Sequence, residues 1–260
     1  KKPQDISLKE IQKVKYASIQ VRLGGGQNTL LVLEEDREGI LKWTSSNYIK
    51  VYTLRGIVIR LTGLGNELEK LEDCYVKAAK LAYQIGFDFI DLKQCHTYLL
   101  NELLAAKTRT GRYGGSFENR TRFIRNIIGK IRAEIGPELI LSSRLNIYDG
   151  VAYMPNQDTN IGIPREAMTP YPYGFGVDEE NPPSPDLEEP IRLIGLMKEW
   201  GVSLVNVSMG SPYYNPHIGR PFERPPVDGY ETPEHPLVGV DRHFQLTAQI
   251  QRSCPDLPIV

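Results

Sequence analysis

Long apolar segments, an excess of one charge and paired cysteines are all missing from this sequence. No apolar run approaches the roughly 20 residues that cross a bilayer, so we expect no membrane-spanning segment. The 31 lysine and arginine residues nearly balance the 32 aspartate and glutamate residues, which leaves a net charge of -1. That balance gives no electrostatic basis for binding nucleic acid or an anionic membrane surface, and we expect neither as a partner.

The three cysteines, Cys74, Cys95 and Cys254, are odd in number and widely spaced. This arrangement argues against a disulfide framework, and no C-x-x-C pair offers ligands for zinc or an iron–sulfur cluster. Residues 1–15 are polar and contain no apolar stretch of the kind found in the centre of a signal peptide. The sequence therefore predicts a cytoplasmic globular protein with reduced thiols and no metal site.

Helical and strand patterns alternate from about residue 68 onward. Apolar residues at helical spacing predict a helix over residues 68–85, and the apolar run 87–92 predicts a buried strand. Ser116 is placed to cap the next helix, which has an isoleucine-rich stripe and ends at Gly136. Helices in these positions are crossovers between parallel strands.

The second half of the chain continues this alternation. It predicts a strand at Leu139–Leu145, a helix at Pro190–Trp200, a strand at Ser203–Ser208, a helix capped by Asp241 that runs to about Arg252, and the start of a strand at Leu257–Val260. Strands that alternate with crossover helices form a parallel sheet. A (β/α)8 barrel needs about 250 residues. We therefore expect an α/β protein of the (β/α)8 (TIM) barrel class rather than an open sheet.

Two parts of the chain stand outside this alternation. Residues 1–66 hold four strand-like segments, so we divide the chain into a strand-rich N-terminal part of the barrel (1–66) and a barrel core with active-site loops (67–260). The strand-like segments are Ala17–Leu23, Thr29–Leu33, Tyr48–Leu54 and Gly56–Leu61, with a turn at Gly24–Gly26. Residues 148–189 and 209–240 are long loops that follow predicted strands, where barrel enzymes form their active sites.

Three polar residues follow directly after the predicted strand 87–92. Lys93, His96 and Tyr98 would lie together at the carboxyl end of that strand. A cation or an imidazole can polarise a carbonyl group, and a phenol can deliver a proton. A histidine satisfied by structural hydrogen bonds and a tyrosine in a helix core are the alternatives, and spacing alone leaves the two interpretations about even.

The segment from Gly86 to Phe123 carries a more specific pattern. A G-F-D strand is followed by His96-Thr97-Tyr98-Leu99-Leu100 and then by the run Y-G-G-S-F-E-N-R-T-R-F, which occupies residues 113–123. This combination resembles the old yellow enzyme family of NADH:flavin oxidoreductases, and the resemblance extends over about residues 67–260. It implies an FMN-binding TIM barrel that takes electrons from NADH or NADPH. Residues 1–66 have no match in this pattern.

The resemblance implies roles for individual residues. His96 matches the second member of the pair that holds the electron-withdrawing oxygen of the substrate, and Tyr98 matches the tyrosine that donates a proton while flavin N5 delivers hydride. Arg144 matches the strand arginine that lies against the N1/O2 edge of the isoalloxazine; a strand-end ion pair is its alternative. Lys93 stands in place of the first histidine of the pair. Because an ammonium cannot reproduce imidazole geometry, we expect an acceptor that is more acidic or bulkier than a simple enone.

The loop after the strand at 203–208 supplies further candidates. Tyr213, Tyr214, His217 and Arg220 are candidate substrate contacts, with a solvated loop as the alternative. We interpret the run 113–123 as structural: it caps the next helix, and its arginines fasten the preceding loop.

The function implied by the resemblance is an FMN-dependent oxidoreductase of the ene-reductase type, with an activated unsaturated small molecule as acceptor. Two alternatives stay open: a Schiff-base barrel lyase that uses Lys93, and a non-catalytic truncated barrel that serves as an interaction domain. In the family, FMN phosphate is bound after the seventh and eighth strands. Val260 falls where the seventh would begin, so we expect the barrel to be incomplete or to be completed by segments absent from this sequence. The sequence leaves the oligomeric state open, and a homo-oligomer is one of the alternatives.

Overall fold

The computed structural model describes residues 16–19, 33–35, 41–43, 65–225 and 229–260, with side chains from residue 68 onward. The predicted strands at Tyr48–Leu54 and Gly56–Leu61 and the turn at Gly24–Gly26 lie outside these residues. Among the described residues of this N-terminal part, 16–19 form a strand that pairs with the strand following the first crossover helix.

The core of the molecule is an open parallel sheet of four strands. Its members are β1 (Tyr16–Ile19), β4 (Phe89–Gln94), β5 (Ile140–Tyr148) and β8 (Leu204–Met209), which lie side by side in their order along the chain. Each neighbouring pair is parallel. Val260 donates to the carbonyl of Val205 at 3.0 Å, so the last residues start a further parallel strand beside β8, as predicted.

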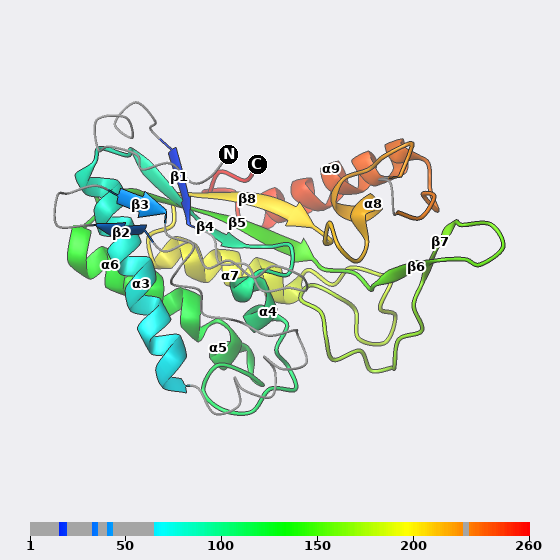
Figure 1. Ribbon diagram of the computed structural model, residues 1–260, viewed down its shortest axis with the longest axis horizontal. Coiled ribbons are helices and arrows are strands. Elements are labelled where there is room, and N and C mark those ends of the chain that lie inside the picture. Colours follow the sequence, from blue (N-terminus) through cyan, green and yellow to red (C-terminus); the bar gives the residue numbers. More distant parts are fainter. Residues whose placement is uncertain (1–15, 20–32, 36–40, 44–64, 226–228) are drawn as a thin grey trace.

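Strand order equal to chain order has a consequence for the helices. Crossovers between parallel strands are right-handed, so an unreversed order places every crossover helix on the same face of the sheet. The helices in the described residues are α3 (Gly65–Gln84), α4 (Leu99–Leu104), α5 (Phe117–Arg120), α6 (Arg122–Ile135), α7 (Glu188–Glu199), α8 (Pro216–Gly219) and α9 (Pro236–Ser253). Figure 1 shows α3, α6 and α7 along one side of the sheet. This winding is that of a (β/α) barrel, and the described strands leave it unclosed.

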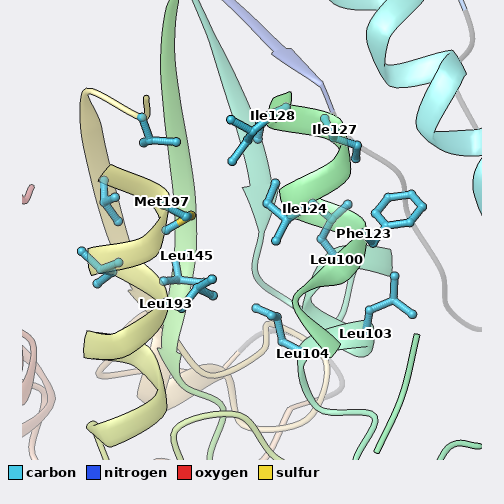
Figure 2. Packing of buried hydrophobic residues seen from close by; sticks show 14 of the residues in the cluster. Leu100, Leu103, Leu104, Phe123, Ile124, Ile127, Ile128, Leu145, Leu193 and Met197 are labelled. Atoms are coloured by element: carbon cyan, nitrogen blue, oxygen red, sulfur yellow. The ribbon is translucent and has the colours of Figure 1, made fainter. Parts of the chain in front are cut away.

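The hydrophobic core lies between the sheet and these helices. In Figure 2, isoleucines of α6 and leucines of α4 face one side of the sheet, and Leu193 and Met197 of α7 pack beside Leu145 of β5. Ile127, Ile128 and Leu145 have no exposed surface. Burial of such side chains is worth about 1.5–3 kcal/mol each. The apolar stripes recognised in the sequence are therefore the surfaces by which the helices pack against the sheet.

The opposite face of the sheet is polar. Along β4 the residues that point to the helices are Ile90, Leu92 and Gln94, and Gln94 donates to Ser143 Oγ at 2.8 Å and to Met197 Sδ at 3.1 Å. Because side chains alternate along a strand, Asp91 and Lys93 point the other way. The same alternation in β5 and β8 gives that face Ser142, Arg144, Asn146, Asn206 and Ser208.

Short elements occupy the loops at the carboxyl ends of the strands. β6 (Tyr153–Pro155) and β7 (Gly162–Pro164) form a hairpin in the predicted long loop after β5, and α8 lies in the loop after β8. Both loops project beyond the arrowheads of β5 and β8 in Figure 1. Near the other end of the chain, β2 (Leu33–Glu35) pairs antiparallel with β3 (Leu41–Trp43).

Two details of the helices differ from the sequence prediction. The predicted helix that follows Ser116 is divided into α5 and α6 at Thr121, although Ser116 does cap it, by accepting from the amide of Asn119 at 3.3 Å. The cap at Asp241 is wrong. The cap of α9 lies six residues earlier, at His235, because His235 Nδ1 accepts from the amide of Leu237 and Pro236 brings no amide that needs a partner.

Candidate active site

The site expected from the sequence lies on the polar face of the sheet, where the carboxyl end of β4 lies beside the middle of β5. Lys93 pairs in register with Arg144, which in turn pairs with Asn206, so the three residues form one row across β4, β5 and β8. Neighbouring strands lie about 4.8 Å apart, so two cationic side chains from one row share one region of space.

His96 comes from the turn between β4 and α4. Its Nε2 lies 2.7 Å from Ser208 Oγ, which joins the end of β4 to the end of β8. Burial, together with the positive charges of Arg144 and Lys93, lowers the pKa of His96 to about 4. The imidazole is therefore neutral at neutral pH, with one nitrogen engaged by the serine and the ring still able to exchange one hydrogen bond with a ligand.

The backbone of this turn is unusual. His96 has φ 61° and the following Thr97 has φ 59°, which are left-handed values that cost non-glycine residues about 1–2 kcal/mol each. Thr97 donates its amide to Asn101 Oδ1 at 2.8 Å and its hydroxyl to the carbonyl of His96 at 2.6 Å. These bonds hold the turn in its strained shape, in which the His96 ring meets Ser208 of β8.

Tyr98 lies at the start of α4, directly beside Lys93. The Lys93 Nζ atom is 3.5 Å from the centroid of the Tyr98 ring, which is within the range of a cation–π contact. Tyr98 is partly exposed, whereas Leu99 and Leu100 after it are buried in the core. Tyr98 is therefore not the core tyrosine that the alternative interpretation required.

Arg144 carries an orphaned donor. Its Nε atom is buried and has no hydrogen-bond partner among the residues that the structure describes. A buried donor left without an acceptor costs about 1–3 kcal/mol, so the site is suited to a ligand that brings an acceptor to this point. The pyrimidine edge of a flavin offers oxygen and nitrogen acceptors of this kind. The donor set at Arg144 therefore fits FMN.

A second layer of polar residues behind the turn was not recognised from the sequence. Asp149 accepts hydrogen bonds from Asn101, Asn146 and the amide of Phe175. Glu102, one residue after Asn101, is partly buried, and burial together with the charge of Asp149 raises its pKa to about 7. Two features of the sequence could have indicated these polar residues. Asp149 stands just after a predicted strand, and polar residues alternate with apolar residues in the strand 203–208.

The four loop candidates differ in their surroundings. Tyr213 and Tyr214 are 49% and 38% exposed, and Tyr214 lies within electrostatic reach of Glu102. Arg220 is exposed. His217 is 2% exposed, its Nδ1 lies 2.6 Å from the hydroxyl of Tyr230, and Tyr153 packs edge-on against its ring. His217 is therefore enclosed by Tyr230 of its own loop and by Tyr153 of the loop after β5.

The run 113–123 has the structural contacts that we inferred for it. Tyr113 donates its hydroxyl to the buried Glu72 of α3 at 2.8 Å. Arg120 donates to the carbonyls of Leu104 and Gly115 and forms a bidentate pair with Glu189 of α7. The run thus ties three crossover segments together and contributes no side chain to the row on the sheet.

The described part of the chain has neither a cluster of metal ligands nor a helix that could span a membrane. Among the described residues between 16 and 260, no three histidine, cysteine, aspartate or glutamate side chains are grouped so that they could hold a metal ion. Within the same residues, no helix combines the length and the hydropathy needed to span a bilayer.

Comparison with protein families supports the resemblance inferred from the sequence. Residues 62–161 match the NADH:flavin oxidoreductase / NADH oxidase family, a segment that contains Lys93, His96, Tyr98 and Arg144. Residues 1–88 match a second family, the Group 4 capsule polysaccharide lipoprotein gfcB, YjbF, and the two matches overlap over residues 62–88. The second match falls mainly on residues that the structure does not describe.

Individual relatives agree with the first match. The chain is 34% identical over 146 residues to an NADH:flavin oxidoreductase of Gibberella zeae. This alignment covers 55% of this chain and 30% of the relative. It is 35% identical over 102 residues to an NADPH dehydrogenase of Clostridium acetobutylicum. This alignment covers 37% of this chain and 30% of the relative. A solved 2-naphthoyl-CoA reductase complex aligns with 93% of this chain and 28% of its own, at 18% identity and a TM-score of 0.47, a score at which the likeness carries no argument.

The chain thus spans less than a third of the length of these curated relatives. Over the matched segment, the comparisons confirm the resemblance to the old yellow enzyme family. The names of the relatives agree with the enzyme class, the flavin and the nicotinamide reductant that the resemblance implies.

Proposed function

We propose that this chain is part of an FMN-dependent oxidoreductase that reduces an activated carbon–carbon double bond in a small molecule, with NADH or NADPH as the source of electrons. The proposal rests on one observation: two groups of different chemistry lie close together on the polar face of the sheet. One is Arg144, whose buried Nε has no hydrogen-bond partner within the described part of the chain. The other is the turn with His96 and Tyr98, which offers a neutral imidazole and a phenol.

The residues would divide the work as follows. Arg144 would hold the electron-rich edge of FMN, and bound FMN would supply the hydride. His96 and Lys93 would hold the carbonyl or nitro oxygen of the substrate, which draws electrons from the double bond. Tyr98 would deliver a proton from its hydroxyl to the carbon next to that activating group. The ammonium of Lys93 beside the Tyr98 ring favours negative charge on the phenol oxygen after the proton leaves.

The loops supply candidates for substrate selection. Tyr213 and Tyr214 are exposed in the loop after β8, whose strand also provides Ser208, the partner of His96. We propose that they contact the body of the substrate, with Arg220 at the outer edge of the same loop. His217 supports this loop through Tyr230 and Tyr153 and is not proposed as a contact.

A spectroscopic experiment tests the proposal. The full chain is mixed with FMN, separated from free flavin and titrated with NADH or NADPH without oxygen, and an activated alkene is then added. We expect the flavin band to be retained, bleached by the nicotinamide and restored by the alkene. A chain that folds but retains no FMN, or a reduced flavin that no activated alkene reoxidises, would refute the proposal. Borohydride trapping of a carbonyl compound on Lys93 would favour the lyase alternative instead.

A further inference from the structure

Asp149 is a partly buried carboxylate that joins three separate segments behind the candidate site. It follows β5 directly and accepts from Asn101 Nδ2 at 2.9 and 3.2 Å, from Asn146 Nδ2 at 2.8 Å and from the amide of Phe175 at 2.9 Å. Burial raises the pKa of Asp149, and these three donors act in the opposite direction. The carboxylate is thus held mainly by neutral amide donors, each with a fixed direction.

The first connection leads to the strained turn. The amide group of Asn101 is 48 residues from Asp149 in the chain and is 2% exposed. Because Asp149 engages its NH2 group, the Oδ1 atom must point the other way, toward the amide of Thr97 at 2.8 Å. The carboxylate therefore fixes which end of the Asn101 amide faces the turn. Without it, the amide could flip and the left-handed turn at His96 and Thr97 would lose its acceptor.

The second connection leads to the strand that carries Arg144. Asn146 stands two residues after Arg144 on the same face of β5, and it pairs in register with Ser208 of β8. Its Nδ2 donates both to Asp149 and to the carbonyl of Gly210 at 2.8 Å. One carboxylate therefore links the turn with His96, the strand with Arg144 and the end of β8 that holds Ser208.

We infer that Asp149 is a positioning residue that sets the distance between the substrate-holding turn (His96 to Tyr98) and the cofactor-holding Arg144, acting through Asn101 and Asn146. This inference rests on the proposed function, because that function assigns the turn to the substrate and Arg144 to the cofactor. The positioning of the turn and Arg144 by Asp149 is a property of the chain alone. Misplacement of reacting groups by about 1 Å can cost about 100-fold in rate, so such a link would be felt in catalysis.

Glu72 provides a matched control. It is a carboxylate that is 1% exposed and also joins separate segments, since it accepts from Tyr113, Asn126 and Lys130. It lies between α3 and α6 and has no bond to the turn. Loss of Glu72 should lower stability as loss of Asp149 does, without moving His96 relative to Arg144.

The primary test is a nuclear magnetic resonance titration of the His96 imidazole in the chain without flavin. Asp149→Asn removes a negative charge, and by electrostatics alone this change would lower the pKa of His96 or leave it unaltered. If the turn relaxes and exposes the ring to water, the pKa of His96 instead rises from about 4 toward its ordinary 6.5. We expect a rise of about one unit or more in Asp149→Asn and in Asn101→Ala, and none in Glu72→Gln.

The second readout is kinetic, with the FMN-loaded chain. In Asp149→Asn we expect reoxidation by an activated alkene to slow about 10- to 100-fold while reduction by the nicotinamide changes less than about threefold. If Asp149→Asn does not fold, Asn101→Ala decides the question. An unchanged His96 titration in folded Asp149→Asn or Asn101→Ala would overturn the inference. A chain without flavin activity would refute only the proposed function, because the titration needs no flavin.

Discussion

The ammonium of Lys93 lies over the ring of Tyr98, with 3.5 Å between Nζ and the ring centroid. The two residues come from different elements, Lys93 from the polar face of β4 and Tyr98 from the start of α4. The strained turn at His96 is what folds the chain back so that they meet. Lys93, the departure from the family pattern, is thus in contact with the expected proton donor.

The contact leads to a prediction for Lys93→Met. Methionine keeps the length and packing of the side chain but removes the charge, so negative charge on the phenol oxygen would be less stabilised. We expect alkene-dependent reoxidation to slow about 3- to 30-fold, which corresponds to the 0.5–2 kcal/mol of such contacts. Stopped-flow absorbance measures this rate, and Lys198→Met, at a surface pair with Asp256, is the control. Equal rates in both variants would contradict the assigned role.

Tyr98→Phe tests proton donation. The variant keeps the ring beneath Lys93 and removes the hydroxyl, so the reduction of flavin by the nicotinamide should be largely intact. Reoxidation by an alkene should fall about 100- to 10,000-fold, the range that general acids contribute. Tyr83→Phe, at an exposed position of α3, serves as the control. Equal losses in the two half-reactions would show that Tyr98 is not the proton donor.

Arg144→Ala tests the proposed flavin contact. Removal of a charged hydrogen-bond donor costs about 1.5–3 kcal/mol, so the dissociation constant of FMN should rise about 10- to 150-fold. Fluorescence quenching of added FMN measures this constant. Arg192→Ala removes an arginine from the surface of α7, where it pairs with Glu118, and should leave FMN affinity unchanged. An unaltered affinity in Arg144→Ala would separate Arg144 from the cofactor.

His217 gives a prediction about acid stability. Burial lowers its pKa to about 4, below its unfolded value of 6.5, so the unfolded chain takes up a proton first as the pH falls. Stability from this group is complete above pH 6.5 and is lost progressively as the pH falls toward 4. His217→Phe should be less stable than the parent by about 1 kcal/mol at pH 7.5, because it loses the bond to Tyr230.

Urea unfolding at several pH values measures this difference. Because phenylalanine does not titrate, the gap between His217→Phe and the parent should narrow as the pH falls below 6.5, close at about pH 6 and be reversed at about pH 4.5. A gap that stays constant over that interval would show that His217 is not held neutral by burial.

The sequence was sufficient to predict the alternation of β4, α6, β5, α7 and β8, because apolar periodicity reports directly which side of each element is buried. Lys93 was selected by its place after the predicted strand 87–92 and Arg144 by the family resemblance, and the structure places these two residues in register on neighbouring strands. The start of α9 was missed although Pro236 is a standard signal for the first helical position. There the error came from preferring an aspartate cap.

Other features had no local signal. The left-handed backbone at His96 and Thr97 depends on Asn101, whose own orientation depends on Asp149, 48 residues away. Neither asparagine nor aspartate is unusual at such places in a sequence, so only the folded structure reveals the link. The same holds for Ser208, which meets His96 across 112 residues. Closure of the barrel cannot be read from periodicity, because each βα unit follows the same pattern in open and closed sheets.

The contacts of Arg120 indicate which part of the sequence pattern belongs to the scaffold and not to the candidate site. Its guanidinium joins the end of α4 to the loop before α5 and to Glu189 of α7, and none of these atoms belongs to the row of Lys93 and Arg144. The Y-G-G-S-x-E-N-R run is consequently a marker of the scaffold. A homologue could retain that run unchanged after losing its chemistry, whereas the identities at positions 93, 96, 98 and 144 would diverge. Under the proposed function, those four positions should distinguish active members better than the longer signature does.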